Sequence, residues 1–144
     1  ANFLIKKKAL SIHMGLAPYY RGTDCNFWAL YDRNPQFVGA TIYYLSKGLD
    51  TGNILYHALS KKNNNPFIYT MSTVKAAFDS LVRRIKDESI FRIKPVQQDK
   101  SKEIRYSKKS DFSEQIIKEY FKKKIVVPKI NFNKQDYKDP FILK

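Results

Sequence analysis

The chain is short of cysteine and of long apolar runs, and each shortage excludes a class of site or protein. Its one cysteine, Cys25, excludes an intramolecular disulfide and a Cys-x-x-Cys metal site. No apolar run approaches the length of a membrane span. The N-terminal lysines follow the first apolar run, which is the reverse of a secretory signal. We therefore expect a cytoplasmic protein, because a single cysteine also suits a reducing compartment.

The chain has 144 residues, of which 43% are hydrophobic and 15% aromatic, and this composition is typical of one folded domain with a real core. The formal net charge is +14. Successive segments 1–50, 51–100 and 101–144 carry +3, +5 and +6, so the excess is spread along the chain. A dispersed excess favours solubility and gives weak attraction to polyanions, but it does not define a nucleic-acid groove.

The apolar pattern predicts an α/β fold with at least partly parallel strand pairing. Three segments read as strands because they are rich in β-branched, aromatic and other apolar residues: 8–13, 39–46 and 53–59. Between the first two, segment 24–32 has helical spacing, with Asp24 placed to cap it.

Two further helices are predicted on either side of an irregular stretch. Segment 70–89 carries apolar residues at three- and four-residue intervals, and Ser72 or Thr73 is placed to cap it. Segment 113–124 has Ser113 as its cap and lysines in its last turn, where the helix dipole favours them. The asparagine-rich stretch 61–66 is predicted to be an exposed loop, and the chain beyond Pro128 is predicted to be extended.

Two ionisable residues stand out on this scaffold. His13 ends the first predicted strand, and Asp50 lies in the turn-rich GLDTGN segment between the second and third. In open α/β sheets, sites form outside the carboxyl ends of strands. A carboxylate beside a histidine raises the pKa of the imidazole and fixes its orientation, so the pair can donate to an oxyanion or move a proton. The alternative is a packed histidine and an ordinary turn aspartate; His57, in an apolar run, is interpreted as structural.

Several ordered motifs resemble the folate-dependent formyltransferases, a family that includes methionyl-tRNA, glycinamide ribonucleotide and sugar-nucleotide formyltransferases. SIHMGLAPYYRG (11–22) is similar to that family's Asn-x-His followed by a loop ending in Arg-Gly. GATI (39–42) and DTG (50–52) stand where the family has a Gly-Val-Thr-Ile strand and an Asp-x-Gly loop. RYSKKSDFSEQII (105–117) resembles, more weakly, a later segment of some members.

The resemblance implies a transfer of formyl from 10-formyltetrahydrofolate to a primary amine, such as that of a sugar nucleotide or another small molecule. His13 would then bond the formyl oxygen, and Asp50 would hold His13 and help to relay the amine's proton. Folate would contact the backbone of Lys47, Gly48 and Leu49. The loop that ends in Arg-Gly would border the acceptor, through Pro18, Tyr20, Arg21 and Gly22, and Arg21 is suited to an anion such as phosphate. No metal is implied.

The sequence departs from the family at two points. Ser11 replaces the asparagine that donates to the oxyanion, so we expect Ser11 to act as a shorter donor or through water. The family's Rossmann-like N-terminal half has no counterpart here. The resemblance therefore implies a partial catalytic domain, the C-terminal part of a mixed sheet flanked by helices, over 1–104. A C-terminal helix and an extended tail over 105–144 would pack on it. Strand 9–13, central and parallel in the family, would then have an open edge that recruits another subunit or the missing half.

Three other functions stay open at this stage. The dispersed positive charge allows a basic RNA-binding accessory module. The loss of the asparagine allows a non-catalytic remnant that keeps the fold. A Ser-His-Asp hydrolase is formally possible but lacks a glycine-flanked nucleophile elbow.

Overall fold

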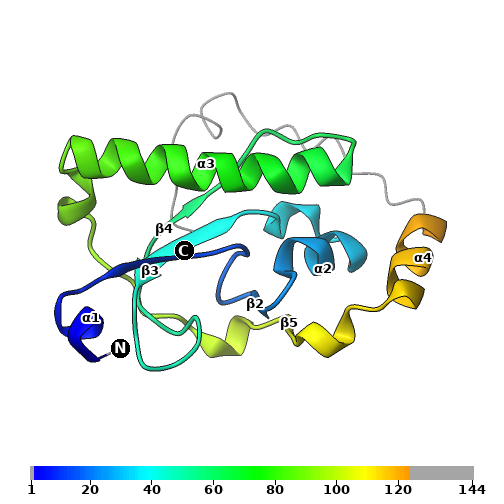
Figure 1. The fold of residues 1–144 in the computed structure, drawn as a ribbon, viewed down its shortest axis with the longest axis horizontal. Helices are drawn as coiled ribbons and strands as arrows, with labels where there is room; N and C mark the ends of the chain where they lie inside the picture. The colour runs from blue at the N-terminus through cyan, green and yellow to red at the C-terminus, as the bar shows by residue number, and fades with distance from the viewer. Residues whose placement is uncertain (1, 124–144) are drawn as a thin grey trace.

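A long helix lies over a three-stranded sheet, and most of the shorter elements gather at one end of that sheet (Figure 1). The computed structural model describes residues 2–123. The helices are α1 (Asn2–Lys6), α2 (Cys25–Tyr31), α3 (Pro66–Lys86) and α4 (Glu114–Lys122). The strands are β1 (Leu10–His13), β2 (Tyr20–Gly22), β3 (Ala40–Tyr44), β4 (Ile54–Ala58) and β5 (Arg105–Ser107). The predicted α/β class is confirmed, and none of the described helices is long and apolar enough to cross a membrane.

The strands form two sheets of opposite pairing. In the larger sheet the order is β1-β3-β4, and both pairs are antiparallel. In the smaller sheet β2 pairs with β5 in parallel. The expected open edge of strand 9–13 is confirmed among the described residues, whereas the parallel pairing that the resemblance implies is wrong. Among the described residues β1 is an edge strand paired antiparallel with β3, because the chain leaves β1 and enters β3 at the same end of the sheet.

The start of α3 also differs from the prediction. The helix begins at Pro66 rather than near residue 70, and neither Ser72 nor Thr73 caps it. The side chain of Asn65 accepts hydrogen bonds from the backbone N–H groups of Phe67 and Ile68. An asparagine cap followed by proline at the first helical position is a strong helix start, and it lies inside the stretch that was predicted to be a loop.

The other two helix starts divide. The side chain of Ser113 accepts from the backbone N–H of Ile116, so the predicted cap of α4 is confirmed. Asp24 occupies the capping position of α2 but makes no side-chain capping bond, since its backbone is in the left-handed region with φ 55°. The predicted extended tail beyond Pro128 lies outside the described residues.

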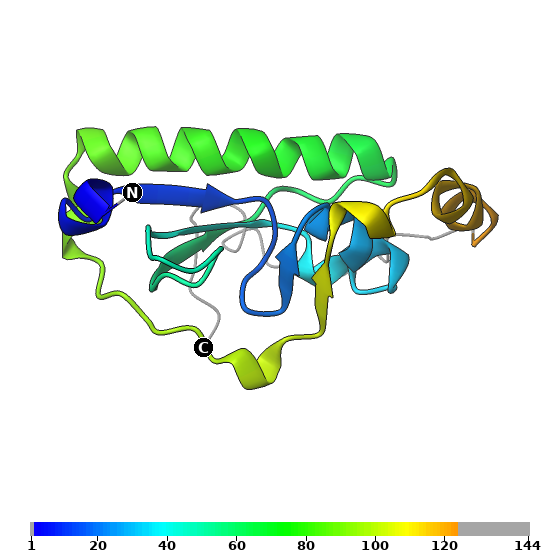
Figure 2. The ribbon, with the colours of Figure 1, turned by 60° about the horizontal axis from the view of Figure 1, so that its bottom comes forward.

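The core has two clusters that flank the end of β1. One gathers aromatic side chains of α2, α4 and the β2 segment, including Tyr20, Trp28 and Tyr120. The other lies between α3 and the larger sheet and includes Ile42, Tyr56 and Ala77, with Leu10 and Ile12 packed at its margin. Figure 2 shows α3 as a separate layer, with the larger sheet on one side of it. The turn that follows His13 therefore leaves the sheet where the two clusters meet.

Candidate active site

The candidate site is built on one face of the larger sheet. In the register of β1 with β3, Ser11 is paired with Tyr43, and His13 is paired with Thr41. Thr41 is in turn paired with His57 on β4. Because side chains alternate between the faces of a strand, these five side chains share one face. Leu10, Ile12 and Ile42 point to the other face, where α3 packs.

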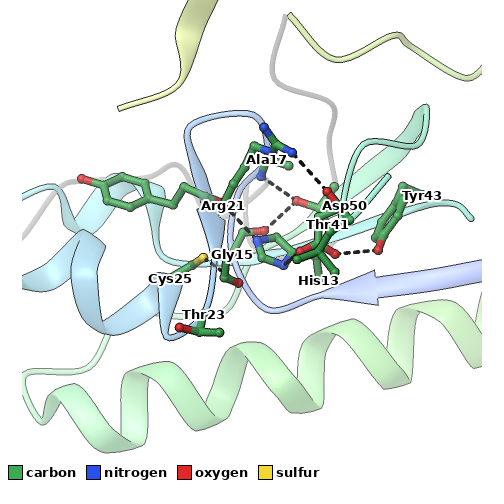
Figure 3. Close-up of polar contacts among 12 residues, drawn as sticks. His13, Gly15, Ala17, Arg21, Thr23, Cys25, Thr41, Tyr43 and Asp50 are labelled. Atoms are coloured by element: carbon green, nitrogen blue, oxygen red, sulfur yellow. Dashed lines mark hydrogen bonds and ion pairs between the residues drawn. The ribbon is translucent and has the colours of Figure 1, made fainter. Parts of the chain in front are cut away.

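Asp50 reaches His13 by a route that strand order does not predict. The carboxyl ends of β1 and β3 lie at opposite ends of the sheet, because the two strands are antiparallel. The loop after β3 instead folds back along the sheet, and Asp50 Oδ2 comes within 3.3 Å of His13 Nδ1 (Figure 3). The predicted approach of the two side chains is thus confirmed. The reason given for it, that both residues lie at carboxyl ends of strands, is wrong.

Four contacts fix the position of Asp50. The hydroxyl of Tyr43 donates to Asp50 Oδ1 over 2.7 Å. The side-chain amide of Gln98 donates to the backbone carbonyls of both Asp50 and Gly52, each over 2.8 Å. Arg21 Nη2 donates to the carbonyl of Leu49 over 3.1 Å. With φ 52°, Asp50 is itself in the left-handed region, which aspartate tolerates better than most residues. The loop is therefore held from the sheet and from two other segments.

Both ring nitrogens of His13 face acceptors. Nδ1 lies beside the Asp50 carboxylate, and Nε2 is 3.0 Å from the backbone carbonyl of Tyr20. A carbonyl only accepts hydrogen bonds, so Nε2 carries a proton. A proton on Nδ1 completes the pair with the carboxylate. The geometry thus favours an imidazolium, buried with 7% of its surface exposed.

The electrostatics agree with this protonation state. Burial lowers the pKa of His13, but the bond to Asp50 and the contact with Cys25 outweigh it and raise the pKa from 6.5 to about 10. Burial raises the pKa of Asp50, yet His13, Tyr43 and Arg21 together bring it below its usual value. Each partner stabilises the charged form of the other.

Tyr43 links Ser11 to this pair. Burial raises the pKa of Tyr43 to about 12, while a hydrogen bond from Ser11 lowers it and the bond to Asp50 raises it. The phenol is therefore neutral and donates to Asp50. The side chains of Ser11, Tyr43, Asp50 and His13 form a continuous chain of polar contacts.

Thr41 and His57 hold the loop that follows His13. Thr41 Oγ1 donates to the carbonyl of Gly15 and accepts from the backbone N–H of Ala17. His57 Nε2 donates to the carbonyl of Ala17 over 2.8 Å. Burial lowers the pKa of His57 to about 4, although the bond to Ala17 opposes this, so the ring is neutral. His57 has the structural position that the sequence predicts.

The remaining predicted residues fall into two groups. Lys47, Gly48 and Leu49 are exposed at the tip of the loop that carries Asp50, and the Leu49 side chain is 66% exposed. The members of the predicted acceptor loop are instead engaged with the protein itself. Pro18 is buried behind a cis peptide bond with Ala17.

The other three residues of the predicted acceptor loop, Tyr20, Arg21 and Gly22, also pack against or bond to other parts of the chain. The side chain of Tyr20 is fully buried, and its hydroxyl is bonded to Asp32 and Asn34. Arg21 pairs with Glu103 over 2.9 Å. Gly22 has φ 90°, and a Cβ there would lie 1.9 Å from the carbonyl oxygen of Ser107. Only glycine fits that position.

Sequence reasoning missed Tyr43, Thr41 and Gln98. The strand register supplies the first two, because an antiparallel partner of β1 must place them opposite Ser11 and His13. Gln98 has no local sequence signal, since its role depends on a contact 48 residues away. Among residues 2–123, no three or more His, Cys, Asp or Glu side chains gather closely enough to hold a metal ion.

A comparison with known sequence families shows to which family the chain belongs. A sequence model of formyl transferases matches residues 4–77, which is just over half of the chain. The matched segment includes Asp50 and the five side chains, His13 among them, that share one face of the larger sheet. The chain belongs to the formyl transferase family. Over 49 residues it is 35% identical to methionyl-tRNA formyltransferase of Desulforamulus reducens, covering 34% of this chain and 15% of that protein.

Solved structures of formyltransferases share the fold. A 4-N formyltransferase from Francisella tularensis superposes with a TM-score of 0.63 at 23% identity, over 78% of this chain and 46% of that one. The formyltransferase PseJ from Anoxybacillus kamchatkensis gives 0.59 at 23% identity, over 85% and 66%. That structure holds UDP-4,6-dideoxy-4-formamido-L-AltNAc and tetrahydrofolate. The chain thus spans about half the length of the first of these structures and 15% of the curated relative.

Proposed function

We propose that this chain is the formyl-transferring part of an amine N-formyltransferase that uses 10-formyltetrahydrofolate. The proposal rests above all on the His13–Asp50 pair, a buried imidazolium 3.3 Å from a carboxylate within the segment that the family model matches. Two solved relatives that hold tetrahydrofolate or 5-N-formyltetrahydrofolate support the choice of donor. The loop of Lys47, Gly48 and Leu49 fits such a donor, since it is exposed and carries an apolar side chain in the segment that leads to Asp50.

The donor, when bound, would supply a formyl group whose nitrogen is a better leaving group than the nitrogen of an ordinary amide. His13 donates its Nε2–H to the formyl oxygen as negative charge develops there, and gives up the carbonyl of Tyr20 to do so. Asp50 keeps His13 protonated during this exchange. Because the pKa of Asp50 is lowered, its carboxylate is a weak base. Its main role is therefore to hold the imidazolium, and the relay of the amine's proton is secondary.

Tyr43 and Ser11 position the carboxylate in this scheme. With the Tyr43 hydroxyl on Oδ1, the other oxygen of Asp50 faces His13. The Ser11 hydroxyl supports the Tyr43 phenol. In this arrangement Ser11 is a positioning residue, and it does not replace an asparagine donor at the oxyanion. Loss of one such donor typically costs about 10²–10³ in rate, so we expect turnover slower than in an enzyme that has it.

The acceptor is the amine of a sugar nucleotide or another small molecule. Sugar N-formyltransferases among the solved relatives, including one from Shewanella sp. (TM-score 0.59 at 22% identity), support this choice. Arg21 would meet an anionic acceptor by exchanging Glu103, its present partner. The competing function is a non-catalytic homologue, favoured by the bond from His13 Nε2 to the Tyr20 carbonyl, which uses the donor that catalysis needs.

Folate binding and turnover test the proposal separately. The ¹⁵N-labelled chain is titrated with 5-formyltetrahydrofolate, and the amides of 47–49 and the imidazole of His13 are followed. We expect both sets of signals to shift, and the His13 response to disappear in Asp50→Asn but not in the surface control Asp79→Asn. Shifts confined to other segments, or none up to millimolar folate, would overturn the donor assignment.

Turnover is measured with 10-formyltetrahydrofolate and a panel of amino-sugar nucleotides at high protein concentration. Formation of tetrahydrofolate that depends on the amine and is lost in Asp50→Asn supports transfer. Folate binding without turnover on any amine of the panel supports the non-catalytic homologue.

A further inference from the structure

Arg21 is bonded to two segments that the proposed function assigns to different substrates. Its Nη2 donates to the carbonyl of Leu49 over 3.1 Å, in the loop that carries Asp50 (Figure 3). Its Nη1 donates to Glu103 Oε2 over 2.9 Å, and this is the donor proposed for an anionic acceptor. Since Leu49 belongs to the stretch proposed to meet folate, one guanidinium links the acceptor side of the site to the donor side.

The bond from Arg21 to Glu103 differs from the arginine–carboxylate pair nearby. Arg105 donates through both Nε and Nη2 to the two carboxylate oxygens of Asp32, over 2.9 and 2.7 Å. Arg21 gives Glu103 a single bond, and the side chain of Glu103 is 29% exposed. Two parallel bonds hold a carboxylate more firmly than one. Glu103 is therefore a partner that an anion from solvent can replace, whereas Asp32 is held in place.

The rest of the Arg21 side chain is fixed by the protein. Only 11% of its surface is exposed. Its Nε is buried and has no hydrogen-bond partner among the described residues, so this edge of the guanidinium is closed to solvent. The ring of Tyr106 lies 5.7 Å from the guanidinium carbon. These surroundings keep the guanidinium in place, with Nη2 on the Leu49 carbonyl, while Nη1 changes partner.

We propose that Arg21 couples the binding of the acceptor to the binding of the formyl donor, an inference that rests on the proposed function. A phosphate of the acceptor replaces Glu103 on Nη1 and, with more acceptor oxygens than a carboxylate, holds the guanidinium more firmly. It binds best when Nη2 is on the Leu49 carbonyl, so it selects the held form of the loop. Because folate contacts the same loop, each ligand strengthens the binding of the other.

The coupling reaches the His13–Asp50 pair directly. The carbonyl that Arg21 holds belongs to the peptide bond between Leu49 and Asp50. Burial raises the pKa of Asp50, and the charge of Arg21 is one of the causes that outweigh burial and lower it. A guanidinium fixed by an anion therefore also fixes the carboxylate that lies 3.3 Å from His13. The loop would then be held most firmly when the amine to be formylated is already bound.

The acceptor side is tested first without folate, using UDP, which is part of the ligand in the PseJ structure. We expect UDP to slow amide hydrogen exchange in loop 45–53. In calorimetry, Glu103→Gln should bind UDP about two- to fivefold more tightly, because a partly exposed ion pair no longer competes. Glu114→Gln, the same change at an exposed pair, should not. No UDP binding up to millimolar concentration, unchanged loop exchange, or weaker binding in Glu103→Gln would overturn the proposal.

The coupling itself is tested by titrating 5-formyltetrahydrofolate with and without saturating UDP. We expect folate to bind at least about fivefold more tightly with UDP. The gain should vanish in Arg21→Lys, whose ammonium lacks the fork that serves two partners, and persist in the exposed control Arg92→Lys. Circular dichroism checks that both variants fold. Independent binding, or competition because the carboxylates of folate take Arg21, contradicts the coupling and leaves the donor assignment standing. Absence of folate binding at every UDP concentration overturns both.

Discussion

His13 and His57 are buried in one row of the same sheet, on either side of Thr41, yet one ring is charged and the other is neutral. Burial disfavours the charged form of both rings. His57 meets the carbonyl of Ala17 and is neutral, with its pKa lowered to about 4. His13 also meets a carbonyl but adds the Asp50 carboxylate and is charged. The Asp50 carboxylate, placed by a loop that folds back, is therefore what distinguishes the candidate catalytic histidine His13 from the structural histidine His57.

The largest effect should follow from removal of that carboxylate in Asp50→Asn. Burial is then opposed only by the contact with Cys25, and the pKa of His13 should fall well below its value of about 10. Breaking a buried ion pair typically costs about 3 kcal/mol or more, measured here as the free energy of unfolding at pH 7. In Asp79→Asn, an exposed control, we expect a change within about 0.5 kcal/mol. An equally small change in Asp50→Asn would mean that the pair is not formed in solution.

The next effect is a pH dependence of opposite sign for the two histidines. The folded pKa of His13 is raised, so its stabilisation is complete below pH 6.5 and is lost as the pH rises toward 10. The folded pKa of His57 is lowered, so its contribution is lost as the pH falls from 6.5 toward 4. Each slope reaches at most about 1.4 kcal/mol per pH unit.

Two variants separate these slopes in denaturant titrations from pH 4.5 to 9, a range of about 4.5 units set by the two pKa values. His13→Gln should flatten stability on the alkaline side only, and His57→Gln on the acid side only. Equal flattening on both sides by either variant would show that the two rings are not in distinct environments.

A smaller effect is expected for Tyr43→Phe. The variant removes the hydroxyl that donates to Asp50 and the partner of Ser11, at a cost of about 1–2 kcal/mol in unfolding free energy. The pKa of Asp50 should rise, because one of the bonds that lower it is gone. Tyr44→Phe is the matched control, since Tyr44 points to the opposite face. Equal losses in the two variants would place no special role on the Tyr43 hydroxyl.

The smallest effect is local and belongs to Gln98→Ala. This side chain holds the carbonyls of Asp50 and Gly52, so its loss should speed amide hydrogen exchange in loop 45–53 with little change in global stability. Gln97→Ala is the control. If exchange in this loop is unchanged, the loop is held by Arg21 and Tyr43 alone.

The local features of this arrangement could be predicted from the sequence, whereas the strand pairing and the contacts between distant segments could not. The strands, the helices and the spacing from His13 to Asp50 follow from apolar period and family motifs. The antiparallel pairing of β1 with β3 does not, because strand direction depends on where the connection 14–39 returns. Tyr43 and Gln98 became visible only with that register and with contacts far apart in sequence.

The helix α3 shows the same limit. Its apolar residues correctly predicted a helix, but not which side the sheet covers, since small residues such as Ala77 and Ser80 pack closely there. The apolar period was right, and the buried face was different. Periodicity reports which side of a helix is apolar, whereas packing against a sheet also depends on how closely the backbones approach.

The most direct test of the account is a ¹⁵N NMR titration of the imidazole nitrogens in the wild-type chain, whose only two histidines are His13 and His57. We expect one ring to keep both nitrogens protonated through pH 8, and the other to stay neutral, with one protonated nitrogen, down to pH 5; these limits follow from pKa values of about 10 and about 4. If instead both rings titrate together near 6.5, the ordinary value for histidine, the charged pair at the centre of this account does not exist.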